Sequence, residues 1–398
     1  MLRKLLQQSL IYFTTLVGGK LLSAVYFMIL ARVLLPDRFG EVMLFTTLVQ
    51  LVTTIFDVGL KNWYLKQSAS SKQPALLGQL LAWRLSLAVI SILVMMVIQW
   101  WWSPLPAGVS SYFWVSLFFE SLITVADSYY LACGQSLYLG YKLIVRNLLF
   151  FASLWLIRTP ADINYFYQSY LLTWTLIIIF YFPWRAVWTS WCRGCQHWPN
   201  IWSTWPYAAI DSLGVIYSRA DQLIINSFLD TYALGLYGAA YRYLDAFNLL
   251  PQALFHNLFP LAAKKGGLSR RQIVKMVVVM TAAGLAVAVA MVTLSQFLTV
   301  TLLGADYAPA AGILRLLAVV VVLFFFNAPL NTVLQSGDRV ACYVPFLLGS
   351  TLANLGLNWW LVPRLGMYGS VWAMIGGECL LVIVNIYLVW RQTKHQRC

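Results

Sequence analysis

Long apolar runs recur along the whole chain, and short polar breaks separate them. A run of about 20 apolar residues is long enough to cross a bilayer as an α-helix. Twelve such runs can be distinguished, whereas the short alternating segments typical of membrane barrel strands do not occur in the pattern. We therefore predict an all-α polytopic membrane protein with about twelve transmembrane helices.

The predicted spans fall into two sets of six. The first set covers residues 8–34, 40–60, 75–100, 111–131, 143–157 and 164–184. The second set covers residues 207–229, 233–261, 273–303, 310–334, 341–362 and 367–390. The longest connection separates the two sets. We expect an N-terminal lobe over residues 1–185, a cytoplasmic linker over 186–204 and a C-terminal lobe over 205–398.

A weak internal repeat supports the division into two lobes. Residues 29–43 (ILARVLLPDRFGEVM) and residues 225–237 (INSFLDTYALGLY) each end a long span in a few polar residues. In both, a glycine then opens the next span: Gly40 in the first and Gly235 in the second. Parallel repeats of this kind are a transporter architecture in which the substrate path runs between the halves.

Composition and charge fix the orientation. Of the 398 residues, 61% are hydrophobic and 10% are charged, against about 25% charged in ordinary soluble domains. Eighteen Lys and Arg residues fall in connections on the side of the termini and four on the other side. The positive-inside rule therefore places both termini in the cytoplasm. The net charge of +14 is scattered among short loops, so we expect no nucleic-acid partner.

The stretch from Trp205 to Leu261 carries charges inside two predicted spans. Asp211, Arg219 and Asp221 lie in the first, and Arg242 and Asp245 lie in the second. Each charge at a helix centre costs about 2.5–3.5 kcal/mol on insertion scales, so these helices must turn a polar side to protein or water. We infer a polar, partly hydrated central cavity enclosed by the two lobes.

Three segments resemble a known family. Residues 31–40 (ARVLLPDRFG), followed by 56–60 (FDVGL), resemble the first hairpin of Wzx-type polysaccharide flippases, which belong to the multidrug/oligosaccharidyl-lipid/polysaccharide exporter superfamily. Residues 219–225 (RADQLII) with 234–242 (LGLYGAAYR) resemble the seventh-to-eighth hairpin of that family. Residues 303–315 (LGADYAPAAGILR) resemble its loop into the tenth helix.

The resemblance implies a function as well as a fold. It implies that undecaprenyl-diphosphate carrying an oligosaccharide unit is turned from the cytoplasmic to the outer leaflet by alternating access, for surface polysaccharides such as O-antigen. It also implies a bacterial inner-membrane location and membrane lipid as a partner. The polysaccharide polymerase and chain-length proteins are further candidate partners. No catalytic residue, cofactor or metal is expected.

Candidate site residues follow from what a diphosphate and sugars require. Arg suits phosphate because its planar fork bonds two oxygens. The bases inside spans, and hence the candidates for phosphate, are Lys20, Arg84, Arg219, Arg242 and Arg315. The amides that can line the path for sugar hydroxyls are Asn327, Asn331 and Asn354. Carboxylates in or near spans are candidates for proton or ion coupling; these are Glu120, Asp127, Asp211, Asp245 and Glu378.

Each of these residues also has a simpler explanation. The bases can neutralise nearby acids, and Arg242 and Asp245, one helical turn apart, can pair directly. Arg315 can extend to the outer interface. The amides can serve as interhelical hydrogen bonds of about 0.6 kcal/mol each.

Other functions are less well supported. The CxxC pair Cys192 and Cys195 lacks a second pair, so it is not expected to bind metal. A membrane glycosyltransferase or polysaccharide polymerase would be expected to carry catalytic residues on a sizeable external loop, whereas every predicted external loop is short. A multidrug exporter of the same superfamily remains an alternative, and it would favour cationic substrates in an acid-dominated cavity.

Overall fold

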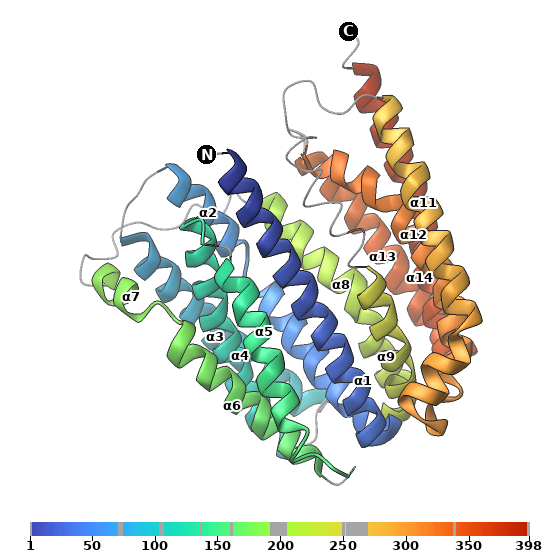
Figure 1. The fold of residues 1–398 in the computed structure, drawn as a ribbon, viewed down its shortest axis with the longest axis horizontal. Helices are drawn as coiled ribbons and strands as arrows, with labels where there is room; N and C mark the ends of the chain where they lie inside the picture. Colours follow the sequence, from blue (N-terminus) through green and yellow to red (C-terminus); the bar gives the residue numbers. More distant parts are fainter. Residues whose placement is uncertain are drawn as a thin grey trace. The chain divides into compact units, whose positions relative to one another are not determined.

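The structure is a computed structural model of the chain. It describes residues 2–70, 75–102, 107–135, 137–159, 162–191, 205–248, 251, 270–336 and 340–395. Every regular element in these ranges is a helix (Figure 1). The α-helices up to the predicted linker are α1 (Leu2–Ile55), α2 (Leu60–Ser70), α3 (Ala75–Trp102), α4 (Ala107–Ala132), α5 (Leu137–Ser153), α6 (Ile163–Tyr181) and α7 (Trp184–Trp191). Those after it are α8 (Trp205–Phe228), α9 (Thr231–Phe247), α11 (Arg270–Thr293), α12 (Ala310–Ser336), α13 (Val340–Leu365) and α14 (Met367–His395).

Each of the twelve predicted spans overlaps one of these helices. Within the described residues, six helices are long and apolar enough to cross a membrane, and the bent pair α6–α7 adds a seventh if it forms one span. The predicted all-α polytopic class is therefore confirmed. Residues 192–204 of the predicted linker and most of residues 249–261, where the eighth span was expected to end, lie outside the described residues.

The first two predicted spans are the two limbs of α1. The turn expected between them is a single break at Leu35, whose φ of 64° and ψ of 165° are not helical. Pro36 explains the position of this break. Its ring disfavours helical backbone in the residue before it, and it has no N–H with which to continue the hydrogen-bond ladder. The helix resumes directly after the break instead of entering a loop.

Two helices were not predicted, and one begins earlier than expected. The predicted spans left connections where α2 and α7 lie, because α2 is polar and α7 has only eight residues. Trp184 and Trp188 of α7 are exposed. The axis of α7 is bent by 65° from that of α6. The fifth span was expected from Leu143, whereas α5 begins at Leu137.

Contacts between residues group the chain into two compact units. The first comprises Met1–Tyr26 and Leu44–Val215, and the second comprises Phe27–Met43 and Ile216–Cys398. The tip of the first hairpin thus packs with the second half of the chain. The predicted lobe boundaries at residues 186–204 stay a prediction.

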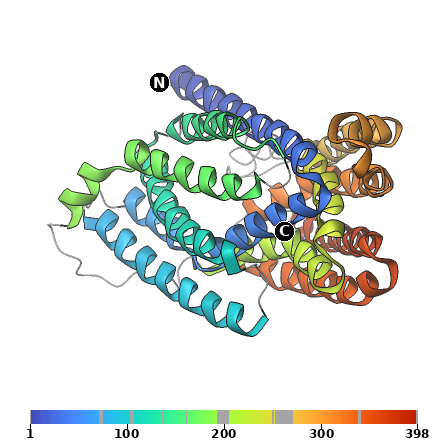
Figure 2. The ribbon, with the colours of Figure 1, turned by 90° about the horizontal axis from the view of Figure 1, so that it is seen from below.

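The first unit is built on the packing of α3 with α4 and of α6 with α4 and α5 (Figure 2). An aromatic cluster joins α1 to α4 and α6. The ring of Phe45 lies 6.2 Å from that of Phe113, 5.1 Å from that of Tyr167 and 5.4 Å from that of Tyr170. Such edge-to-face contacts add about 0.5–1.5 kcal/mol each beyond the apolar area they bury.

In the second unit, the two glycines of the predicted repeat lie against each other. A Cβ on Gly40 would overlap the Thr231 carbonyl oxygen, and a Cβ on Gly235 would overlap the Pro36 carbonyl oxygen. The Thr231 hydroxyl also donates a hydrogen bond to Asp37. The two repeat hairpins therefore cross backbone to backbone, which only glycine at both positions permits.

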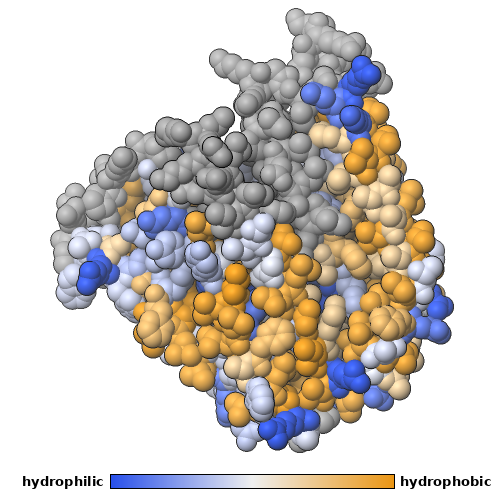
Figure 3. Space-filling model, viewed as in Figure 1, coloured by the Kyte–Doolittle hydropathy of each residue, from blue (hydrophilic) through white to orange (hydrophobic). Residues whose placement is uncertain are grey.

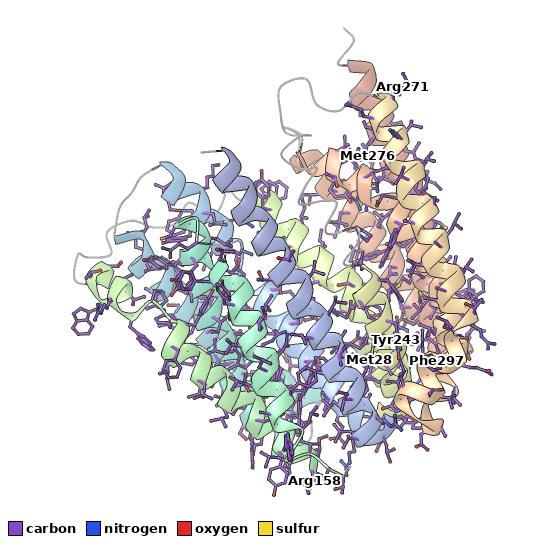
Figure 4. The ribbon with its side chains drawn as sticks, viewed as in Figure 1. Met28, Arg158, Tyr243, Arg271, Met276 and Phe297 are labelled. Carbon is purple, nitrogen blue, oxygen red and sulfur yellow. The ribbon has the colours of Figure 1, made fainter. Side chains whose placement is uncertain are left out.

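The rest of the second unit packs around α12, which contacts α11, α14 and α9. Small residues of α11 permit a close approach to α12, because a Cβ on Gly284 would lie 2.8 Å from Phe325 Cβ on α12. Near the other end of α11, the Tyr243 hydroxyl of α9 donates to the Leu298 carbonyl oxygen at 2.5 Å. Figure 4 labels Tyr243 and Phe297, the residue that precedes Leu298 in the sequence.

Candidate functional site

Arg84 on α3 is buried and paired in the first unit. Its side chain is 3% exposed, and Nη1 donates to Asp57 Oδ1 at 2.9 Å. Nη2 donates to the Thr53 carbonyl oxygen at 3.1 Å and to the Thr124 hydroxyl at 3.4 Å. Asp57 follows the end of α1 in the FDVGL segment. It was not identified from the sequence as a partner of Arg84. Three acceptors hold the guanidinium, so Arg84 stabilises this corner of the unit.

The two acids of α4 receive hydrogen bonds from α5 and α6. Lys142 Nζ lies 2.5 Å from Asp127 Oδ2, and the Tyr181 hydroxyl donates to Asp127 Oδ1 at 2.8 Å. The Tyr170 hydroxyl donates to Glu120 Oε1 at 3.3 Å. Glu120 and Asp127 therefore belong to a network that links α4, α5 and α6.

The remaining candidates of the first unit are less enclosed. Lys20 is partly buried on α1. Asp211, near the start of α8, is exposed, and its Oδ2 accepts a hydrogen bond from Asn62 Nδ2 of α2 at 3.1 Å. Asp211 therefore links α8 to α2.

In the second unit, two arginines share one carboxylate. Arg219 Nη2 lies 3.1 Å from Asp245 Oδ2, and Arg242 Nη1 lies 4.0 Å from the same oxygen. The side chain of Asp245 is 34% exposed, and those of Arg219 and Arg242 are 13% and 17% exposed. Two guanidinium groups and one carboxylate therefore meet at a position that solvent reaches.

Aromatic rings hold these arginines in place. The Arg219 guanidinium lies 5.2 Å from the ring centroid of Tyr241, and that of Arg242 lies 3.7 Å from the ring centroid of Phe27. Contacts of this kind are worth about 0.5–2 kcal/mol, the larger values applying where the charge is desolvated. Asp221 lies deeper, at 2% exposed, and accepts a hydrogen bond from the Tyr237 hydroxyl.

A second polar cluster surrounds Glu378 of α14, which is 3% exposed. The Tyr217 hydroxyl donates to Glu378 Oε1 at 2.8 Å, and Asn327 Nδ2 donates to Oε2 at 2.7 Å. Asn385 Nδ2 then donates to the amide oxygens of Asn327 and Asn331, at 3.0 Å each. Neutral groups alone hold this buried acid, since no base forms an ion pair with it in the described ranges.

Two members of this cluster were missed by sequence reasoning. Asn385 lies two helical turns after Glu378 on α14, and Tyr217 lies one turn before Asp221 on α8. Helical spacing could have indicated both residues. Asn354, by contrast, donates to the Ala373 carbonyl oxygen at 3.3 Å and accepts from Asn358 at 3.1 Å, which makes it part of the α13–α14 packing.

Arg315 differs from the other arginines of the predicted spans. It is exposed, and its Nε donates to the Ser295 hydroxyl at 2.8 Å. Cys192 and Cys195 lie outside the described residues. Among the described residues, no group of three or more His, Cys, Asp or Glu side chains is arranged to hold a metal ion.

Comparison with known proteins identifies the family. Residues 5–265, more than half of the chain, match the family described as polysaccharide biosynthesis protein. No curated protein matches the sequence. The fold is that of transporters and flippases, which are not enzymes.

Three solved structures carry the comparison of folds. An inward-facing multidrug resistance MATE family transporter of the MOP superfamily is 14% identical, with a TM-score of 0.74 over 95% of each chain. An outward-facing MATE family transporter is 14% identical, with a TM-score of 0.61 over 99% of this chain and 96% of that one. The lipid II flippase MurJ, in an inward closed conformation, is 12% identical, with a TM-score of 0.68 over 96% of this chain and 87% of that one.

Identities this low establish the fold alone, whereas the family match reaches across both units. The chain belongs to the polysaccharide biosynthesis family, and its predicted resemblance to Wzx-type flippases of the multidrug/oligosaccharidyl-lipid/polysaccharide exporter superfamily is confirmed.

Proposed function

We propose that this protein is a flippase for undecaprenyl-diphosphate-linked oligosaccharide units. It turns them from the cytoplasmic to the outer leaflet of the bacterial inner membrane by alternating access, for the assembly of surface polysaccharides such as O-antigen. The substrate path runs through a central cavity between an N-terminal lobe (1–185) and a C-terminal lobe (205–398). Both termini are cytoplasmic, as the distribution of Lys and Arg favours.

The observation that carries this proposal is the pairing of two arginines with one acid. Arg219 and Arg242 both approach Asp245, whose side chain is 34% exposed, so the two guanidinium groups lie where solvent reaches them. A guanidinium group at a position that solvent reaches suits phosphate oxygens, which it can bind in bidentate fashion. The diphosphate of the substrate displaces Asp245 from one or both arginines as it enters.

The other candidate residues take supporting roles in this proposal. Lys20 adds positive charge in the N-terminal lobe, and Asn331 offers its amide to the sugars. Arg84 and Asn354 support the path indirectly, through the packing contacts described above. Asn327 holds Glu378, which gains and loses the coupling proton. Glu120, Asp127 and Asp211 are secondary candidates for coupling. Membrane lipid surrounds the protein, and the polymerase and chain-length proteins of polysaccharide assembly receive its product.

A genetic test separates this function from the multidrug exporter that the likeness to MATE transporters leaves as the alternative. Deletion of the gene is expected to abolish the surface polysaccharide and to leave lipid-linked units on the cytoplasmic leaflet. The two quantities to measure are cell-surface polysaccharide and the leaflet distribution of the lipid-linked units. If deletion leaves the polysaccharide intact and only raises drug sensitivity, the flippase proposal fails.

The paired arginines are then tested by complementation. Arg219→Ala and Arg242→Ala are each expected to lower polysaccharide export by about tenfold or more, because a charge-assisted hydrogen bond is worth ~1.5–3 kcal/mol. Arg364→Ala is the matched control, since Arg364 is exposed and contacts only its own helix in the described interactions. Protein level is measured alongside. Export equal to wild type in both variants would remove the pair from the path.

A further inference from the structure

A groove between α11 and α12 is lined by apolar side chains and contains one charged residue. Its volume is about 400 Å³. Val289 and Val292 of α11 form one wall, and Ala318 and Val319 of α12 form the other. Arg315 of α12 is the charged member. The flippase function proposed above does not use this groove.

Among the described residues, the arginine of the groove has no acidic partner. In the part of the chain that the structure describes, no carboxylate forms an ion pair with Arg315, and its Nε hydrogen bond goes to the uncharged Ser295 hydroxyl at 2.8 Å. Arg84, Arg219 and Arg242 each have a carboxylate within 4.0 Å. A full positive charge at the edge of an apolar groove favours an anionic ligand with an apolar body.

The surroundings of the groove match lipid. Only 17% of the most apolar window of α11 is buried inside the protein. Its exposed side chains include Val278 at 61% and Val289 at 63%. In Figure 3 the surface over α11 is hydrophobic along most of its length and hydrophilic near the end where the helix begins. This side of α11 therefore meets acyl chains.

The dimensions of the groove also match one leaflet. Arg315 lies five residues after the first residue of α12, which places its Cα about 7.5 Å along the helix axis. From Arg315 to Leu323, the groove follows α12 for about 12 Å. Half of the hydrocarbon core of a bilayer is about 15 Å thick. A phosphate at Arg315 thus leaves its acyl chain a groove of nearly matching length.

We propose that this groove is a binding site for a net-anionic glycerophospholipid of the outer leaflet. Its phosphodiester pairs with Arg315, and one acyl chain lies between α11 and α12. The single uncompensated cation matches the one negative charge of such a lipid. A polyprenyl diphosphate carries more negative charge than one guanidinium offsets. A zwitterionic lipid adds an ammonium group that Arg315 repels.

Native mass spectrometry of the delipidated full-length protein in detergent tests this site. The probes are phosphatidylglycerol, phosphatidylethanolamine and undecaprenyl diphosphate, each titrated separately. Wild type is expected to bind the first phosphatidylglycerol about tenfold more tightly than phosphatidylethanolamine, a ratio typical of one charge-assisted hydrogen bond. Arg315→Ala is expected to remove this preference, and Arg315→Lys to keep part of it.

Two further variants keep the test decisive if Arg315→Ala fails to fold. Val289→Trp fills the groove from an exposed position and is expected to weaken phosphatidylglycerol binding with Arg315 intact. Arg364→Ala removes an exposed arginine outside the groove and is expected to bind like wild type. Equal binding by all variants would mean that phosphatidylglycerol binds only as surrounding lipid, which would overturn the proposal. Tighter Arg315-dependent binding of undecaprenyl diphosphate would overturn it in favour of a substrate site.

Discussion

At the scale of single residues, charges inside the predicted spans were readily found, but their partners were not. Sequence spacing offered Arg242 and Asp245 as a pair, whereas the closer partner of Asp245 is Arg219, 26 residues away on another helix. Helical spacing could not indicate Asp57 as the partner of Arg84 either, because the two residues lie 27 positions apart in different segments. Helical periodicity identifies neighbours within one helix, and tertiary packing chooses the partner between helices.

Glu378 carries the residue-scale prediction about coupling. Glu378→Gln keeps the shape of the side chain, and its amide can still bond with Tyr217, but it cannot gain or lose a proton. We expect polysaccharide export to fall by about tenfold or more, with protein level unchanged. This size follows if the lost proton transfer costs about as much free energy as one charge-assisted hydrogen bond. Export is measured at several external pH values.

The control for this variant is Glu41→Gln on α1. Glu41 accepts from Arg38 at 2.6 Å at the first hairpin and lies outside the Glu378 cluster. The Glu41→Gln variant is expected to export as much polysaccharide as the wild type. If Glu378→Gln exports normally at every pH, this acid has a structural role and the coupling proposal must move to another group.

At the scale of elements, apolar periodicity located the spans but not their interruptions or the short helices. It separated two spans at residues 35–39, where the structure has one helix with a break at Leu35. It missed α2, which is too polar to resemble a span, and α7, which is only eight residues long. The repeat glycines were recognised as helix starts, but no local pattern could indicate that Gly40 and Gly235 touch.

That contact leads to an element-scale prediction in which two Gly→Ala substitutions change the stability of the protein in opposite directions. Gly235→Ala is expected to destabilise the protein by about 1–3 kcal/mol, because its Cβ would overlap the Pro36 carbonyl oxygen. Gly349→Ala, within α13, is expected to stabilise it by about 0.5–1 kcal/mol, because a Cβ there meets nothing within 4 Å. Thermal unfolding in detergent measures both. Equal shifts would mean that the hairpins do not cross at Gly235.

At the scale of the whole molecule, charge bias predicts an orientation that neither the helices nor the fold defines. The helices have the length to cross a bilayer, but a helix that crosses in either direction has the same shape. The positive-inside rule breaks this symmetry because basic residues concentrate in alternate connections. Orientation is therefore a prediction of the sequence alone.

Two exposed arginines, both labelled in Figure 4, allow the orientation to be measured. Arg158 lies between α5 and α6 on the predicted external side, and Arg271 begins α11 on the predicted cytoplasmic side. With the six native cysteines replaced, Arg158→Cys is expected to react with an impermeant thiol reagent in intact cells. Arg271→Cys is expected to react only after permeabilisation. The reverse pattern would invert the topology and, with it, the proposed direction of transport.

The crossing of the two hairpins also constrains how the protein is made. Asp37 and its partner Thr231 are 194 residues apart in the chain. At ribosomal rates of about 5–20 residues per second, the first hairpin emerges roughly 10–40 s before the segment that covers it. During that interval, Gly40 and Asp37 lack their native contacts. An insertion chaperone or the translocon itself would have that interval in which to act on the nascent chain at this hairpin.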